Sequence, residues 1–169
     1  WGQEQKQWFF DTVNHSDAAF KILISPTPLV GPDKGWKKDN HANPGFKHEG
    51  DELRDFIGKH KDLFLVCGDR HWQYISVDPV SGTREYSVGS ASDAHATGYT
   101  MKQRTPMHEY LKIKGGYFTV DVRRKNNVPQ MSLRHHGVDG SIYHQDIYQN
   151  DKGIVDLVGR EEASSPIPE

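Results

Sequence analysis

Apolar residues in the first 70 positions follow two patterns that alternate along the chain. Residues 3–15 and 51–60 carry apolar side chains at helical spacing, so each segment predicts a helix that packs one face inward. Residues 21–24 and 63–67 are short and mainly apolar runs, which predict buried strands. Two helix-to-strand units in the same order indicate a layered α/β sandwich.

The second half of the chain changes to short alternating runs separated by turn residues, a pattern typical of antiparallel strands. The predicted strands cover residues 73–77, 84–88, 117–122, 131–135 and 141–148. We therefore expect an antiparallel β-meander after the two helix-to-strand units, and an α/β (α+β) fold for the chain as a whole.

Three further segments lack a regular period and are rich in turn-forming or charged residues. Residues 29–47 predict a long ordered loop, and residues 102–110 predict a short helix or an ordered loop. From residue 149 onward charged residues, Pro and Ser dominate, which predicts a loosely held tail. We therefore expect one domain over residues 1–148 and a polar C-terminal tail over residues 149–169.

The composition indicates a single domain and argues against nucleic-acid binding and a membrane-spanning helix. A chain of 169 residues suffices for one domain, and a net charge of −2 offers no basic surface for nucleic acid. No run approaches the ~20 apolar residues of a membrane-spanning helix. The single cysteine, Cys67, allows no intrachain disulfide, so the cysteine content does not distinguish an oxidising from a reducing compartment. The abrupt start at Trp1, without an export leader, is expected of a segment cut from a longer protein.

The clearest candidate chemistry is the pair Asp69 and His71, which directly follows the buried strand of residues 63–67. Gly68 supplies a turn, and in an extended or lightly turned loop residues two apart point the same way. The two side chains are therefore predicted to converge while Arg70 points elsewhere. A carboxylate beside an imidazole suits iron, zinc, manganese or calcium. The alternative is a surface ion pair or a hydrogen bond.

Other polar residues have one functional and one structural interpretation each. Asn40 and His41 lie on the long loop, where they either contact substrate or make hydrogen bonds within the loop. Arg70 either pairs with a substrate phosphate or bonds to a neighbouring loop. Asp93 and His95 repeat the two-apart spacing, and they either orient a metal ligand or are solvated loop residues.

Several short segments match one known family in their order and spacing. They are Trp1-Gly2-x-x-Gln5-x-x-Trp8-Phe9, Ser16-Asp17-Ala18, the run from Phe20 to Pro28, the run from Asp51 to Ile57, Gly68-Asp69-Arg70-His71, the run from Ser87 to Ser92, and Gly115-Gly116-Tyr117-Phe118. Over residues 1–148 the chain thus resembles the C-terminal half of the alkaline phosphatase D family, the PhoD-like branch of the calcineurin-like metallophosphatases.

This resemblance implies a function and a site. Asp69 and His71 match the family's last metal-binding motif, which serves a binuclear centre known for iron and calcium together. The implied reaction is hydrolysis of phosphate monoesters or diesters, in which two cations clamp the phosphoryl oxygens and activate a water. The family is usually exported, which implies a periplasmic or extracellular location.

The family's other metal ligands come from an N-terminal half. Its motifs, of the types Gly-Asp-x-x-Asp and Gly-Asn-His, have no acceptable match, because Gly50-Asp51 opens a predicted helix and Asp39 replaces the glycine before Asn40-His41. We therefore expect a chain that supplies only part of the site, that needs the missing N-terminal half, and that is inactive alone. The alternative is a non-catalytic β-rich binding or structural module.

Overall fold

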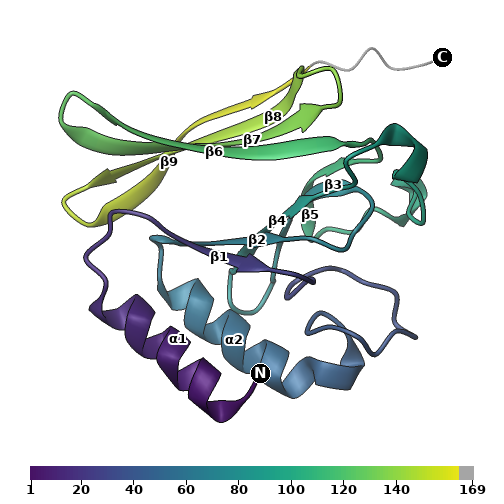
Figure 1. Ribbon diagram of the computed structural model, residues 1–169, viewed down its shortest axis with the longest axis horizontal. Helices are drawn as coiled ribbons and strands as arrows, with labels where there is room; N and C mark the ends of the chain where they lie inside the picture. Colours follow the sequence, from purple (N-terminus) through teal and green to yellow (C-terminus); the bar gives the residue numbers. More distant parts are fainter. Residues whose placement is uncertain (164–169) are drawn as a thin grey trace.

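The protein consists of three layers: two helices, a mixed sheet in the middle, and an antiparallel sheet on the far side (Figure 1). The computed structural model describes residues 1–163. Its helices are α1 (Gln3–His15) and α2 (Lys47–Lys59), with 3-10 helices η1 (Pro44–Phe46), η2 (Asp93–His95) and η3 (Met101–Gln103). Its strands are β1 (Lys21–Ser25), β2 (Leu63–Cys67), β3 (Gln73–Val77), β4 (Arg84–Val88), β5 (His108–Lys112), β6 (Gly116–Lys125), β7 (Val128–Gly137), β8 (Ile142–Asp151) and β9 (Ile154–Glu162). The predicted α/β (α+β) class is confirmed.

The middle sheet has the strand order β1-β2-β4-β3-β5. Its first three strands run parallel, with Ser25 opposite Cys67 and Cys67 opposite Ser87. β3 and β5 complete the sheet in the antiparallel sense. The carboxyl ends of β1, β2 and β4 therefore meet at one edge of the sheet.

The second sheet has the order β6-β7-β8-β9, antiparallel throughout, and stacks on the middle sheet (Figure 1). Two apolar cores hold the three layers together. The core between the helices and the middle sheet is formed by Phe9, Val13, Leu29, Val30, Leu53, Ile57, Leu63 and Leu65. The core between the two sheets is formed by Phe64, Val66, Ile75, Tyr86, Tyr110, Met131, Leu133 and Tyr148. β2 contributes to both cores, which explains its unbroken apolar sequence.

Both predicted helices are present, and α2 begins earlier than the sequence indicated, at Lys47. Within residues 1–163 no helix is long and apolar enough to cross a membrane.

Two sequence-based expectations are wrong. The segment predicted as a short helix or loop contains η3 and the edge strand β5, which pairs with β3. The predicted loose tail is ordered up to its last described residues, because β9 pairs with β8 from residue 154 to residue 162. Edge strands are commonly short or rich in charge, so they lack the apolar pattern that identifies a central strand. Residues 164–169 of the predicted tail lie outside the described part.

Candidate functional site

The candidate site lies where the parallel strands end. The loop after β2 starts with Gly68, whose N–H donates to Ser25 O of β1 at 3.1 Å. β4 ends on the other side of β2, and Gly89 follows it with φ +75°. Ligand sites in open α/β sheets gather outside the carboxyl ends of the strands. The fold therefore places the residues after β2 at the edge where such sites form.

The chain turns sharply at Asp69. Asp69 has φ +66°, and the Arg70 N–H donates to Gly68 O at 2.8 Å, which closes a γ-turn. Of the two predicted forms, extended or lightly turned, the loop is therefore turned at this residue. Residues other than glycine rarely adopt a positive φ, and those that do are often found at functional sites. Asp69 and His71 are both exposed, and Arg70 between them is buried.

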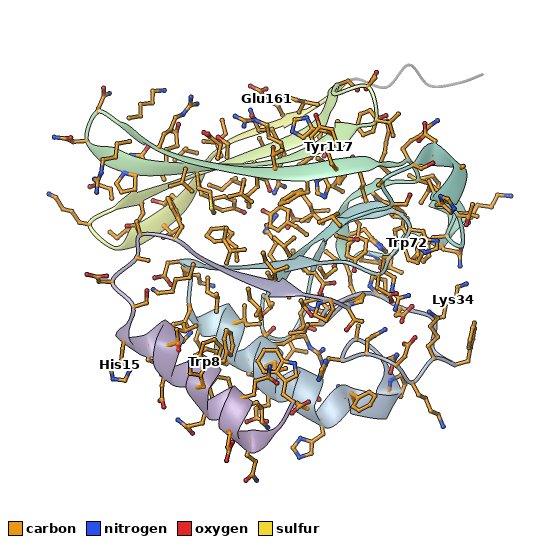
Figure 2. The ribbon with its side chains drawn as sticks, viewed as in Figure 1. Trp8, His15, Lys34, Trp72, Tyr117 and Glu161 are labelled. Atoms are coloured by element: carbon orange, nitrogen blue, oxygen red, sulfur yellow. The ribbon has the colours of Figure 1, made fainter. Side chains whose placement is uncertain are left out.

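Arg70 is held by a buried carboxylate from the long loop. Its Nη2 donates to Asp33 Oδ2 at 2.8 Å, and the side chains of Arg70 and Asp33 are 5% and 1% exposed. The same Nη2 lies 3.1 Å from Asp69 Oδ2. Figure 2 shows Lys34 of this loop and Trp72 of the β2–β3 connection at the same end of the molecule. The geometry favours the structural interpretation of Arg70, a bond to a neighbouring loop.

The donor atoms of Asp69 and His71 are accessible. His71 makes no hydrogen bond to another residue within the part of the chain that the structure describes, and the Asp69 carboxylate has one ion-pair partner there, Arg70. A carboxylate and an imidazole suit hard or borderline cations. Among residues 1–163, however, no group of three or more His, Cys, Asp or Glu side chains is placed to hold a metal. The pair therefore fits as part of a metal site, and further ligands must come from outside these residues.

Asn40 has partners within its own loop, whereas His41 has a partner on α2. Asn40 is buried, donates to Asp33 Oδ2 at 2.7 Å and to Asp39 Oδ1 at 2.9 Å, and accepts from the Ala42 N–H at 3.0 Å. His41 Nε2 lies 2.8 Å from an oxygen of Glu49 on α2. These contacts favour hydrogen bonding within the loop over substrate contact for Asn40, whereas the contact of His41 ties the loop to α2.

Asp93 and His95 lie on η2, beyond the end of β4, and both are exposed. Asp93 Oδ1 accepts from the Gly115 N–H at 2.9 Å, which fixes the chain before β6. In the described part of the chain neither side chain bonds to Asp69 or His71. The structure thus gives Asp93 a structural contact, and an orienting role for either residue stays a prediction.

Sequence reasoning missed Glu85, a fully buried carboxylate in β4. It accepts hydrogen bonds from the N–H groups of Leu29 at 2.6 Å, Val30 at 3.0 Å and Gly31 at 3.0 Å, and from Tyr74 Oη at 2.7 Å. These bonds fasten the loop after β1, which carries Asp33, to the middle sheet. The alternation of β4 gave no sign of this role, because a glutamate in a strand ordinarily faces solvent.

Cys67 lies next to this group but offers no nucleophile. Its Sγ is 3.5 Å from Tyr74 Oη, and burial together with the charge of Glu85 raises the pKa of the thiol well above its ordinary value. Because the thiolate is the reactive form, the buried thiol is inert.

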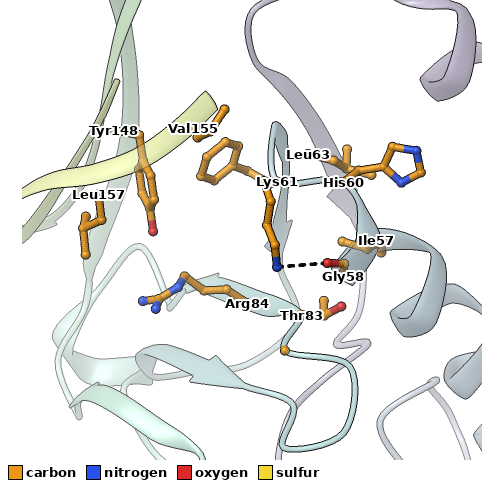
Figure 3. A pocket seen from close by; sticks show the side chains of 12 residues that line it. Ile57, Gly58, His60, Lys61, Leu63, Thr83, Arg84, Tyr148, Val155 and Leu157 are labelled. Carbon is orange, nitrogen blue, oxygen red and sulfur yellow. Dashed lines mark hydrogen bonds between the residues drawn. The ribbon is translucent and has the colours of Figure 1, made fainter. Parts of the chain in front are cut away.

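A separate cavity of about 220 Å³ lies at the opposite end of the parallel strands (Figure 3). The end of α2, the starts of β2 and β4, and the β8–β9 hairpin line it. No carboxylate is among the lining residues, and Lys61 Nζ donates to Gly58 O at 3.2 Å while Arg84 bonds to Glu109. This cavity lacks the donor pair found at the carboxyl edge.

No family model and no curated protein matches the sequence. Among solved structures the chain is similar to one described as "Structure of PhoD", with a TM-score of 0.57 and 16% sequence identity. The chain has a PhoD-like fold. The match covers 94% of this chain and 35% of the other, so this chain spans about a third of the length of the structure that it matches.

Proposed function

We propose that this chain is the C-terminal part of a metal-dependent phosphoesterase, in which Asp69 and His71 are metal ligands. One observation carries the proposal: an exposed carboxylate and an exposed imidazole lie at the carboxyl edge of parallel strands, in a fold similar to that of PhoD. Ligand position in such sheets and the chemistry of the two donors both support it.

Asp69 and His71 would hold part of a binuclear centre, for which iron with calcium, zinc or manganese are suitable cations. When bound, such cations neutralise phosphoryl oxygens and lower the pKa of a water. The contribution of this chain would be to hold the two proposed ligands in position. The Asp33–Arg70 pair fixes the turn that presents the Asp69 carboxylate at the edge. The proposed substrate is a phosphate monoester or diester.

The remaining ligands belong to protein outside this chain. The matched structure is almost three times as long as the segment that this chain covers, which leaves room for an N-terminal half. We therefore expect the isolated chain to hydrolyse little or no phosphate ester and to bind metal weakly.

Metal analysis of the longer protein tests the proposal. We expect tightly held metal ions in near-stoichiometric amounts after gel filtration, and a loss of most of this metal in Asp69→Ala and His71→Ala. His48→Ala is the matched control, because His48 is exposed on α2 and lies outside the site. Equal metal content in His71→Ala and His48→Ala would remove His71 from the site.

A non-catalytic β-rich module is the second candidate. The observation in its favour is that no three potential ligands gather within residues 1–163. It predicts a longer protein that retains no metal and hydrolyses no phosphate ester.

A further inference from the structure

One side of the two-sheet sandwich is closed by ion pairs. β5 and β9 are edge strands of the two sheets, and Glu109 of β5 accepts from Arg160 Nη1 of β9 at 2.8 Å. Arg160 also donates to the buried Asp146 at 2.6 Å. The other two edge strands, β1 and β6, lie on the opposite side of the sandwich, nearest the viewer in Figure 1.

On that opposite side the apolar faces of the two sheets extend past the core. Ile22 and Ile24 pair with Phe64 and Val66 of the inter-sheet core, so they face the second sheet, yet they are 37% and 78% exposed. A similar exposure is found on β6 of the second sheet. Val120 and Val122 of β6 pair with the core residues Leu133 and Met131, and they are 38% and 57% exposed. Four aliphatic side chains thus face the side on which the two sheets pack, yet they remain exposed to solvent.

The backbone of β1 is open at the same place. The Lys21 N–H donates to Asp62 O at 2.7 Å and Ser25 O accepts from the Gly68 N–H at 3.1 Å, so the odd-numbered residues of β1 bond to β2. In a parallel ladder alternate residues bond to the same neighbour. The N–H and C=O groups of Ile22 and Ile24 therefore point to the free edge, where an added strand would bond.

We propose that this edge binds a strand, parallel to β1, from the part of the PhoD-like domain that lies outside this chain. The inference rests on the proposed function for the identity of the partner. The matched structure is covered over only 35% of its length, so most of that chain is available to supply the strand. Apolar side chains at alternate positions of this strand would cover the exposed Ile22 and Ile24 and reach toward the exposed Val120 and Val122.

The position of the proposed metal site is the reason for proposing that the added strand runs parallel to β1. A strand parallel to β1 ends at the carboxyl edge, and it lies roughly 5 Å beyond β1 and about 10 Å from β2. The loop after such a strand reaches the edge where Asp69 and His71 are exposed. The same strand thus completes the apolar core and delivers the missing ligands.

Co-purification tests this docking without any use of activity. The tagged 169-residue chain is produced together with the separate polypeptide encoded immediately upstream of residue 1 in the natural gene. Ile24→Lys and Val122→Lys place an ammonium group among the exposed apolar side chains where the strand is proposed to bind. We expect each substitution to reduce the amount of co-purified polypeptide by about tenfold or more. Ile154→Lys is the matched control, because Ile154 is a 66% exposed residue at the start of β9, and it is expected to retain binding.

Unchanged co-purification in both Ile24→Lys and Val122→Lys would overturn the docking, as would an upstream reading frame without a further domain. A dimer of the isolated chain that Ile24→Lys dissociates in sedimentation would assign the edge to a second copy instead. Both positions are exposed, and circular dichroism checks that the variants fold. Asp69→Ala is expected to retain binding, so hydrolysis that survives in Asp69→Ala contradicts the proposed function and leaves the docking intact.

Discussion

Arg70 and Asp33 form a buried ion pair directly beside the exposed Asp69. Removal of one partner from such a pair leaves an uncompensated charge inside the protein, which is far more costly than the loss of a surface pair. Asn40 donates to the same Asp33 oxygen, so the carboxylate is the centre of the contacts that hold the loop after β1 against the loop after β2.

Asp33→Ala is therefore predicted to lower the free energy of unfolding by about 3–5 kcal/mol. Lys47→Ala is the control, because its ion pair with Asp51 is exposed, and a loss of about 0.5 kcal/mol or less is expected. Urea denaturation at neutral pH measures both values. Equal effects of the two substitutions would show that the Asp33–Arg70 pair contributes little.

His135 makes the stability of the protein depend on pH. Burial lowers the pKa of its imidazole from 6.5 to about 3, and the hydrogen bond from Nε2 to Ser87 O, 2.9 Å long, opposes this shift only in part. Its Nδ1 is buried and has no hydrogen-bond partner among residues 1–163, and the rings of Tyr86, Tyr110, Phe118 and His144 surround the imidazole. The folded protein therefore keeps this imidazole neutral at pH values where the unfolded chain protonates it.

Because the unfolded state binds the extra proton, the stabilisation is complete above pH 6.5 and is lost as the pH falls toward 3. The lowered pKa of His135 predicts a loss of about 2 kcal/mol between pH 7 and pH 5. His135→Gln removes this contribution, and urea denaturation of the two proteins at both pH values measures it. The same pH dependence in the variant and in the original protein would contradict the prediction.

At the scale of elements, the loop between β1 and α2 owes its position to Glu85. One carboxylate accepts three consecutive backbone N–H groups, which a carboxylate does more strongly than any neutral side chain. The bonds join residues 54 to 56 positions apart, so they link the segment after β1 to a strand from a later unit. Loss of these bonds would free the loop that carries Asp33.

Glu85→Gln is predicted to lower the free energy of unfolding by at least about 2 kcal/mol, because an amide cannot accept all of these bonds. Backbone amides of residues 29–31 are expected to exchange hydrogen faster in this variant, as mass spectrometry or NMR can measure. Glu4→Gln, in the exposed first turn of α1, is the control and is expected to leave exchange unchanged. Unaltered exchange at residues 29–31 in Glu85→Gln would disprove the anchoring role.

The sequence predicted those helices and strands whose own residues show a clear apolar pattern. α1 and α2 have regular apolar spacing and β2 is an unbroken apolar run, whereas β5 and β9 are edge strands that depend on pairing with β3 and β8. The Arg70–Asp33 and Glu85 contacts join distant positions and leave no local pattern. At the candidate site the sequence located Asp69 and His71 at the end of a buried strand, and their role as metal ligands stays a prediction.

At the scale of the whole molecule, the described residues form a closed sandwich on the β5–β9 side and an open one on the β1–β6 side. The exposed Asp69 and His71, the proposed metal ligands, follow β2, the strand next to the open edge. The open edge and the proposed metal site are thus adjacent, and we propose that one further part of the domain completes both.

Steady-state hydrolysis of an aryl phosphodiester by the longer protein, with His71→Ala compared with His48→Ala, tests this account most directly. We predict that His71→Ala lowers kcat by about 100-fold or more, because even hydrogen-bond partners of metal ligands contribute about 10- to 100-fold. His48→Ala is predicted to retain the original rate. Turnover in His71→Ala equal to that of the original protein would contradict the assignment of a metal site to this edge.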